Sequence, residues 1–189
     1  MIKKKALFYN DLNGSFFSRT RQVAKVKNTS VLGYIMHKIA NNFLTFLANI
    51  SPIGGLRVFF HRKRGVKIGK SVTLSSKMML ERAFPEYIVI EDFVSFAPGV
   101  VVITHSLPHL HFKGVIMPHV SPVVFKKNSW IGAYSIILPG VTIGEGSIIS
   151  AGSVVNTNVP DNCIVQGNPA QIIHRFTVKD KKKIIAEFN

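Results

Sequence analysis

The chain has 189 residues, of which 47% are hydrophobic, and a formal net charge of +15. A chain of this length and apolar content can bury the core of one main domain with an appended segment. The lone Cys163 excludes an internal disulfide framework and suits a reducing compartment, so we expect a cytoplasmic protein.

The chain starts with MIKKKALFYND, a basic stretch followed by a short apolar run from Ala6 to Tyr9. This run is shorter than the apolar region of a secretory signal. We therefore expect the mature chain to begin near Met1.

Positive charge is concentrated in the first part of the chain. Residues 1–80 hold fifteen Lys or Arg and a single acid, Asp11, which gives a net charge of +14. Residues 81–189 hold nine basic and eight acidic residues, a net charge of +1. We assign most of this basicity to an N-terminal extension, residues 1–64.

An amphipathic helix is predicted within this extension, between Thr29 and Pro52. Its apolar residues follow helical spacing and are Leu32, Ile35, Met36, Ile39, Phe43, Phe46, Leu47 and Ile50. The opposite face carries Lys38, Asn41, Asn42, Thr45 and Asn49. Thr29 or Ser30 is placed to cap the helix, and Pro52 limits its end. The eighteen uncharged residues 39–56 have the length of a membrane span, but their Asn, Ser, Pro and Gly favour a helix that lies flat.

This helix has two interpretations, and both can hold in an oligomer. In the first, it is a cover that packs on the domain that follows and closes an open sheet end. In the second, it acts with the basic stretches RTRQVAKVK and HRKRGVKIGK as an anchor on an anionic membrane, with Arg62, Lys63 and Arg64 facing the lipid. Nucleic acid is not expected as a partner, because aromatic residues do not alternate with the basic ones and no binding motif is present.

From residue 68 onward, large apolar residues recur every six positions. They are Ile68, Leu74, Leu80, then Ile90, Phe96, Val102, and finally Phe125, Ile131, Ile137, Ile143, Ile149 and Val155. Four positions after each member of the last run stands a small or β-branched residue: Ser129, Ser135, Val141, Ser147, Ser153 and Val159. A period of six fits neither an α-helix nor a single strand. It is typical of a parallel β-helix, in which three six-residue units make one triangular coil.

Two interruptions divide this repeat. Leu80 and Ile90 are ten residues apart, so the segment around residues 83–87 must bulge out. Val102 and Phe125 are twenty-three apart, five more than one coil, which predicts an inserted loop over residues 106–122. Insertions in repeat proteins form loops on one face, often the binding face. We place the β-helix domain at residues 65–175 and a basic tail at 176–189.

The histidines around the inserted loop are the candidates for chemistry. His105 directly follows the apolar end of a coil, and a neutral imidazole there can act as general base for acyl transfer. No Ser or Cys is surrounded by a nucleophile motif, so direct transfer is the simpler mechanism. His109, His111 and His119 are surface residues or metal ligands. Since no histidine lies between His119 and His174, we expect no metal site.

Three sequence blocks carry a resemblance to a known family: IEDFVSFAPGVVVITHS, WIGAYSIILPGVTIGEGSIISAGSVV and VPDNCIVQGNPAQII. Over residues 66–175 the chain resembles the hexapeptide-repeat acyltransferases, in the branch of galactoside and maltose O-acetyltransferases and the related polysaccharide O-acetyltransferases. The resemblance implies a left-handed parallel β-helix, although left-handed crossovers are rare elsewhere. It also implies a homotrimer and acetyl-CoA bound in a groove between adjacent subunits.

The resemblance also assigns roles to single residues. His105 matches the catalytic histidine of the family. The backbone amide of Ala133, after Gly132, matches the donor that stabilises the oxyanion formed from the thioester. Trp130 matches a residue that lines the groove, while Ala151 and Gly152 match small residues against which the pantetheine arm lies.

The end of the domain both matches and departs from the family. Gly167 and Pro169 match its terminal Gly-x-Pro turn. Relatives place arginines after this turn to bind the cofactor phosphates, whereas this chain has Gln171 and His174, leaving Arg175 and the lysines 181–183 for that role. The asparagine that orients the acceptor in the sugar enzymes has no match before residue 90.

The resemblance therefore implies an acetyl-CoA-dependent O-acetyltransferase that acts on a hydroxyl of a sugar or cell-surface glycan, with His105 as base. Two alternatives remain open. The same fold can N-acetylate an amino sugar, or it can serve without catalysis as a scaffold or membrane-binding module, because a fold by itself does not fix a function. The predicted location is the cytoplasm, with peripheral attachment to the inner membrane surface under the second interpretation of the helix.

Overall fold

The computed structural model of the chain describes residues 5–6, 20–21, 24–25, 27–106 and 119–177. Its helices are α2 (Val31–Ile50), α3 (Gly54–Lys63) and the short 3₁₀ helix η1 (Pro85–Tyr87). The strands before the inserted loop are β1 (Lys5–Ala6), β2 (Lys67–Ile68), β3 (Thr73–Leu74), β4 (Met79–Leu80), β5 (Ile88–Ile90), β6 (Ser95–Phe96), β7 (Val101–Val102) and β8 (His105–Ser106). Those after it are β9 (His119–Val120), β10 (Val123–Phe125), β11 (Trp130–Ile131), β12 (Ile136–Ile137), β13 (Thr142–Ile143), β14 (Ile148–Ile149), β15 (Val154–Val155), β16 (Cys163–Gly167) and β17 (Ala170–Arg175).

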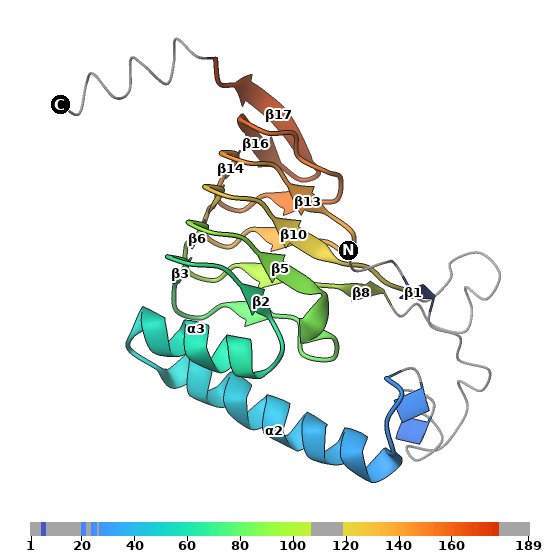
Figure 1. Ribbon diagram of the computed structural model, residues 1–189. Helices are drawn as coiled ribbons and strands as arrows, with labels where there is room; N and C mark the ends of the chain where they lie inside the picture. Colours follow the sequence, from blue (N-terminus) through green and yellow to red (C-terminus); the bar gives the residue numbers. More distant parts are fainter. Residues whose placement is uncertain (1–4, 7–19, 22–23, 26, 107–118, 178–189) are drawn as a thin grey trace.

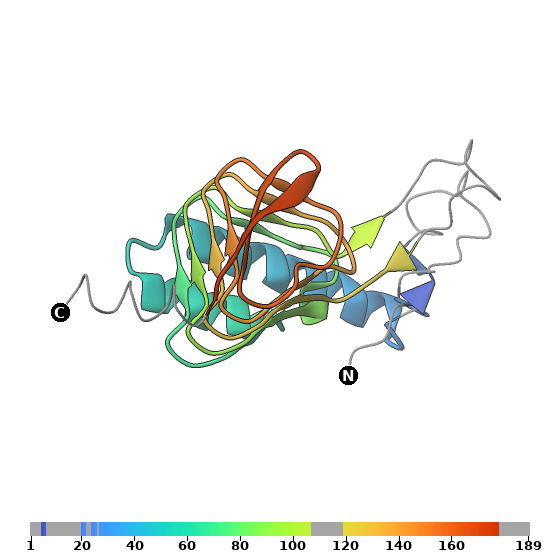
Figure 2. The same cartoon turned by 90° about the horizontal axis from the view of Figure 1, so that it is seen from above.

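The short strands stack in parallel into three sheets, which are the faces of a prism (Figure 1). The sheet orders are β13-β10-β5-β2, β17-β16-β14-β11-β6-β3 and β15-β12-β7-β4. Successive strands therefore change sheet, and three of them complete one coil. The coils are β2–β4, β5–β7, β10–β12 and β13–β15, and Figure 2, seen from above, shows them lying over one another.

The six-residue period marks the interior of this prism. Residues of the predicted series lie opposite one another in all three sheets, as in the rows Ile68, Ile90, Phe125, Ile143; Leu74, Phe96, Ile131, Ile149; and Leu80, Val102, Ile137, Val155. All of them except Ile68 are at most 2% exposed and belong to one core. Each such side chain contributes roughly 1.5–3 kcal/mol by its burial. The predicted parallel β-helix is confirmed.

The second series is buried as well, between 0 and 5% exposed. Its serines lie close to the corners, directly after the residues with positive φ. Ser135 Oγ donates to Gly132 O at 2.8 Å, and Ser147 Oγ donates to Pro160 O at 2.6 Å. Ser153 Oγ accepts from the amide of Gly167 at 3.2 Å, whereas buried Ser129 Oγ has no hydrogen-bond partner among the described residues. Three of the four serines thus satisfy backbone groups at the corners.

The corners require a left-handed backbone. Asn128, Tyr134, Gly140, Gly146 and Gly152 all have positive φ, between 57° and 86°, and they too are six residues apart. Glycine adopts this conformation without steric cost, and asparagine tolerates it. The sequence thus contains a third periodic column, which marks the turns of each coil.

Helix α2 confirms the predicted helix of the extension. Ser30 is the cap, with its Oγ accepting from the amide of Gly33 at 3.0 Å, and the helix ends at Ile50, just before Pro52. No helix in the described part of the chain is long and apolar enough to cross a membrane. The face of α2 that packs on the protein body carries Asn41, Thr45 and Ala48, so its polar side, and not its apolar side, is turned inward.

Helix α3 was not predicted, because its sequence, GGLRVFFHRK, reads as a basic cluster and begins with two glycines. It lies between α2 and the first coil, so the two helices together cover one end of the β-helix (Figure 1). Val58 and His61 are its buried residues. The cover interpretation of the extension therefore describes α3 better than it describes the apolar face of α2.

The expectation that Arg64 faces lipid is wrong. Arg64 is only 2% exposed. Its guanidinium donates to Asn41 Oδ1 at 2.8 Å and to the carbonyls of Leu80, at 3.4 Å, and Glu81. It also lies 3.0 Å from Nδ1 of His61. Burial and the charge of Arg64 lower the pKa of His61 to about 3, so His61 is neutral and accepts this bond.

Both predicted interruptions are present. The bulge between β4 and β5 contains η1. The inserted segment leaves the coil as β8, which pairs antiparallel with β9, and β9 in turn pairs with β1 (Figure 2). At the far end, β16 and β17 form an antiparallel hairpin whose turn contains Gly167 and Pro169, as the Gly-x-Pro motif predicted.

Candidate active site

His105 lies where the chain leaves the second coil. It opens β8 directly after Thr104, which is fully buried and donates from Oγ1 to Phe84 O at 3.3 Å. The imidazole itself is 26% exposed. The ring is therefore attached to a rigid strand end on one side and reaches solvent on the other.

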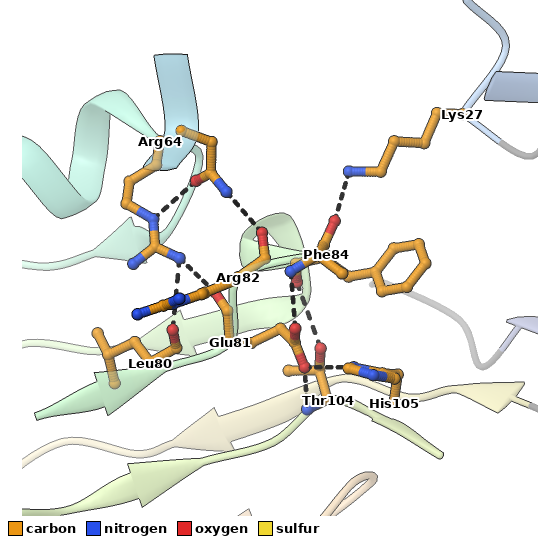
Figure 3. A network of polar contacts seen from close by, with 10 residues as sticks. Lys27, Arg64, Leu80, Glu81, Arg82, Phe84, Thr104 and His105 are labelled. Atoms are coloured by element: carbon orange, nitrogen blue, oxygen red, sulfur yellow. Dashed lines mark hydrogen bonds and ion pairs between the residues drawn. The ribbon is translucent and has the colours of Figure 1, made fainter. Parts of the chain in front are cut away.

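A buried carboxylate orients this ring (Figure 3). His105 Nδ1 lies 2.6 Å from Glu81 Oε2, and the Glu81 side chain is only 4% exposed. Glu81 also accepts from the backbone amides of Ala83, at 2.7 Å, and Thr104, at 3.1 Å. Three donors thus converge on one carboxylate and compensate for its loss of hydration.

The protonation state of this pair follows from its surroundings. Burial alone would raise the pKa of Glu81, but the hydrogen bond and charge of His105 and the amides of Thr104 and Ala83 outweigh it and lower the pKa to about 2. Glu81 is therefore ionised at neutral pH and acts only as an acceptor. His105 Nδ1 must be the donor, which leaves the lone pair of the neutral ring on Nε2.

Nε2 of His105 has no hydrogen-bond partner within the described ranges of the chain. The ring contacts Phe84, with 5.8 Å between ring centroids, and Phe84 lies in turn 5.1 Å from the ammonium of Lys27. The same ammonium donates to Ala83 O at 2.7 Å. The imidazole is thus fixed at Nδ1, packed on one face and open at Nε2, as a general base requires.

Glu81 was not found by sequence reasoning, which left the residue that orients His105 unidentified. A signal for it exists. Leu80 and Val102 occupy the same inward row in consecutive coils, so the residues that follow them meet at the same corner. Glu81 is also the first acid after Asp11. Aligning the coils on Leu80 and Val102 would therefore have placed Glu81 near His105 from the sequence alone.

The predicted oxyanion donor lies at another corner. Ala133 follows β11, and Ala151 occupies the same corner one coil later, where Gly152 N donates to Ala133 O at 2.8 Å. The amides of Ala133 and Ala151 have no acceptor among the described residues. Two adjacent free N–H groups on a rigid corner can bind an anionic or carbonyl oxygen.

The remaining predicted cofactor residues lie along the same sheet. Trp130 is in β11 and is 53% exposed, and Arg175 is exposed in β17, at the end of the same six-stranded sheet. Arg175 Nη1 lies 3.5 Å from Cys163 Sγ. Together with the free amides, these residues lie on and beside one sheet of the prism: Arg175 pairs with Cys163 at the start of β16, while Ala133 and Ala151 follow the ends of β11 and β14. This sheet and its borders are called the donor track below.

Gly132 and Gly152 are glycines for different structural reasons. A Cβ on Gly132 would lie 2.5 Å from Ile149 O and 2.6 Å from Ala151 N, so Gly132 is required where two coils approach closely. A Cβ on Gly152 would meet nothing within 4 Å, and only its φ of +71° favours glycine. Gly152 thus leaves open space at the surface, which suits a groove, whereas Gly132 lets two neighbouring coils pack closely.

The structure does not bring His105 and Ala133 together within one chain. His105 follows the sheet β15-β12-β7-β4, while Ala133 follows a strand of the neighbouring sheet. The predicted base and oxyanion donor therefore occupy different corners of the prism.

Some predicted residues lie outside the described part of the chain. These are His109, His111 and the lysines 181–183. Gln171 and His174, which replace the expected arginines, are in β17. The described residues contain no group of three or more His, Cys, Asp or Glu that could hold a metal ion.

Comparison with known proteins places this geometry in a family. A model of the six-repeat bacterial transferase hexapeptide family matches residues 122–157. A Bacillus subtilis protein named as an acetyltransferase, YvoF, is 30% identical over 139 residues, which cover 72% of this chain and 77% of that protein. The chain belongs to the hexapeptide-repeat acetyltransferases.

One further relative of this acetyltransferase has a more specific name, and one solved structure shares its fold. Galactoside O-acetyltransferase of Escherichia coli K12 is 32% identical over 126 residues, or 66% of this chain and 61% of that enzyme. The crystal structure of a Vibrio cholerae hexapeptide-repeat acetyltransferase complexed with acetyl coenzyme A has a TM-score of 0.64 at 24% identity, covering 77% of this chain and 90% of that one. The predicted family and its left-handed β-helix are confirmed.

The Glu81–His105 pair predicts how the acetyltransferase responds to acid. Because the pKa of Glu81 falls from 4.5 to about 2 on folding, its ionised form stabilises the fold fully above pH 4.5, and this contribution is lost as the pH falls toward 2. The loss is on the order of 3 kcal/mol. Denaturant unfolding should therefore show a stability difference between wild type and Glu81→Gln that is constant above about pH 5 and shrinks below pH 4.5.

The matched control for this experiment is Glu145→Gln, which removes an exposed carboxylate from a corner. Its difference from wild type should change much less over the same range. Equal acid sensitivity of wild type and Glu81→Gln would show that Glu81 is not held ionised by the fold.

Proposed function

We propose that the protein transfers the acetyl group of acetyl-CoA to a hydroxyl of a sugar or glycan, with His105 as the general base. The observation that carries this proposal is the oriented imidazole, with Nδ1 bonded to ionised Glu81 and Nε2 free. The galactoside enzyme of E. coli and the acetyl-CoA complex of the Vibrio protein support the choice of acceptor and donor.

The proposed reaction needs no covalent enzyme intermediate. His105 Nε2 takes the proton of the acceptor hydroxyl while its oxygen attacks the thioester carbonyl. The carbonyl oxygen gains negative charge, and the amide of Ala133 donates a hydrogen bond to it. When the carbon–sulfur bond breaks, His105 returns the proton to the thiolate of coenzyme A. Ionised Glu81 stabilises the imidazolium between these two steps, as the buried carboxylate does in a catalytic triad.

Acetyl-CoA is proposed to lie along the donor track. Trp130 would form one wall of the groove, and Ala151 and Gly152 would leave room for the pantetheine arm because neither projects a large side chain. Arg175, at the C-terminal end, would meet the phosphates, since guanidinium pairs well with them. The two free amides suit the carbonyl oxygens of the donor.

A homotrimer is proposed because His105 lies at one corner of the chain and Ala133 lies at another, so neither corner holds both the base and the oxyanion donor. A prism with three flat faces can pack about a threefold axis, which gives closed symmetry. In that arrangement the His105 corner of one subunit would meet the Ala133 corner of the next. The site would then lie between subunits and would be lost when the trimer dissociates.

Peripheral attachment to the inner membrane surface is the second part of the proposal. It would place the enzyme near lipid-linked glycan acceptors used in cell-surface polysaccharide assembly. The support is the net charge of +14 on residues 1–80, where Lys38, Arg62 and Lys63 are exposed. Each such residue near an anionic surface contributes about 1 kcal/mol before screening.

Removal of the base tests the mechanism. His105→Ala should lower turnover roughly a hundredfold or more, while the fold and acetyl-CoA binding stay nearly unchanged. His109→Ala and His111→Ala are the controls and should have much smaller effects. The measurement is release of thiol from acetyl-CoA with a panel of sugars, oligosaccharides and amino sugars. Near-normal turnover of His105→Ala would refute the mechanism.

A mixture of two inactive variants tests the shared site. His105→Ala removes the base, and Ala151→Phe places a large side chain in the proposed groove at an exposed position. Each variant alone should be nearly inactive. When the two are unfolded together and refolded as mixed trimers, about one quarter of the sites should combine an intact base with an intact groove, so activity should reappear. No recovery in trimers that demonstrably contain both variants would place the whole site within one chain.

A further inference from the structure

Helix α2 carries a continuous row of exposed apolar side chains. The row, called here the α2 stripe, consists of Leu32, Met36, Ile39, Phe43, Phe46 and Ile50, with exposed fractions between 57 and 70%. Their spacing alternates strictly between four and three residues, so they form one straight line along a helix. Ile53, just after the helix, continues the same spacing and is 61% exposed.

The α2 stripe points away from the protein body. At 100° per residue, its members lie on the side of the helix opposite to Asn41, Thr45 and Ala48, which are the buried residues of α2. Asn41 fixes this orientation, because its Nδ2 donates to Arg82 O at 2.6 Å and its Oδ1 accepts from Arg64. The helix is thus held by polar contacts on its inner side and presents its apolar side outward.

This orientation is the reverse of that of an ordinary surface helix, whose apolar side faces the core. The core of the β-helix is complete without α2, since the main cluster of buried apolar residues includes none of its side chains. Leu56 and Phe59 of α3 add further exposed apolar surface, at 44 and 48%. Contiguous apolar surface of this extent marks an interaction site.

The charges around the α2 stripe decide between partners. Between Asp11 and Glu81 the chain has no acidic residue. Lys38 is exposed on the polar side of α2, and the ammonium of exposed Lys63 on α3 lies 5.6 Å from the ring centroid of Phe59, beside the apolar surface. Two copies packed stripe to stripe would bring like charges together and would lack the opposite charges that flank paired helices. An anionic lipid surface satisfies both the apolar row and the surrounding basic residues.

We propose that the α2 stripe inserts into the headgroup boundary of an anionic membrane, with α2 lying flat in the plane of the surface. The helix is twenty residues long, or about 30 Å, and its apolar row runs along the whole of that length. This inference goes beyond electrostatic attachment, because it assigns hydrophobic insertion to one side of one helix.

The position of α2 at one end of the coil stack gives the proposal a geometric consequence. In Figure 1 the helices cover the end next to β2, and β17 lies at the opposite end. A trimer about an axis parallel to the stack, which rests on the proposed function, would present three stripes at the same end. His105 follows the second coil from that end, and each coil adds about 4.8 Å. The base would therefore lie in the part of the stack that is nearer to the membrane.

Vesicle sedimentation with the full-length protein tests the proposal. The probes are vesicles of pure phosphatidylcholine and vesicles that also contain phosphatidylglycerol at about one third of the lipid. The protein should bind the anionic vesicles. Added salt should weaken this binding, but a fraction of the protein should stay bound at high salt. Lys38→Glu with Lys63→Glu should weaken it by roughly tenfold or more, since each charge near the surface contributes about fivefold.

The decisive variant replaces three members of the stripe, as Ile39→Gln, Phe43→Gln and Phe46→Gln. These positions are 57 to 60% exposed, and glutamine is a good helix former, so the fold should persist. Affinity for anionic vesicles should fall at least tenfold, and the part that resists salt should disappear. The matched control is Ile172→Gln with Ile173→Gln, which removes exposed apolar side chains from β17 at the other end and should bind as wild type does.

Three results would overturn the proposal: a full-length protein that ignores every vesicle, a stripe variant that binds as well as wild type, or a stripe variant whose oligomer is smaller by light scattering. The last result would make the stripe an interface between copies. Thiol release with a soluble sugar acceptor separates this test from the proposed activity. It should be equal in wild type and the stripe variant, so loss of membrane binding and loss of catalysis are read independently.

Discussion

The buried carboxylate of Glu81 is the contact on which the candidate site depends. An ionised carboxyl group inside a protein is costly unless donors surround it, and here the donors are two backbone amides and the imidazole of His105. The backbone carbonyl of the same residue accepts from Arg64, a buried cation held by Asn41 of α2. The N-terminal helices, the first coil and the second coil therefore meet at one residue. Removing any member would leave a buried charge or donor without its partner.

The β-helix explains why such a contact can be rigid. Each coil repeats the same inward row, so a side chain at a corner has a fixed neighbour one coil away. Glu81 and His105 use this alignment at one corner, and Ala133 and Ala151 use it at another. The architecture thus orders two groups of candidate residues, which the proposed trimer would bring together.

The sequence predicted most of this architecture because burial imposes a period. The inward series, the two interruptions, and α2 with its cap follow from spacing or from local residue preferences, while the terminal turn came from the family resemblance. The helix α3 was missed because its glycines and basic residues give no apolar period. Arg64 was misplaced because a cluster of cations suggests a surface, whereas burial depends on acceptors that lie 16 to 23 residues away in the chain. The role of Glu81 and the outward direction of the α2 stripe likewise depend on contacts between coils and helices, which no local pattern contains.

In the proposed mechanism, Glu81 holds His105 in the tautomer whose Nε2 can accept a proton. Nitrogen-15 NMR of the histidine side chains, assigned with a His105 variant, measures this directly at neutral pH. We expect a proton on Nδ1 and an unprotonated Nε2 in the wild type, and loss of this preference in Glu81→Gln. A neutral His105 that carries its proton on Nε2 in the wild type would refute this mechanism, because such a ring cannot take the proton of an acceptor hydroxyl at the open position.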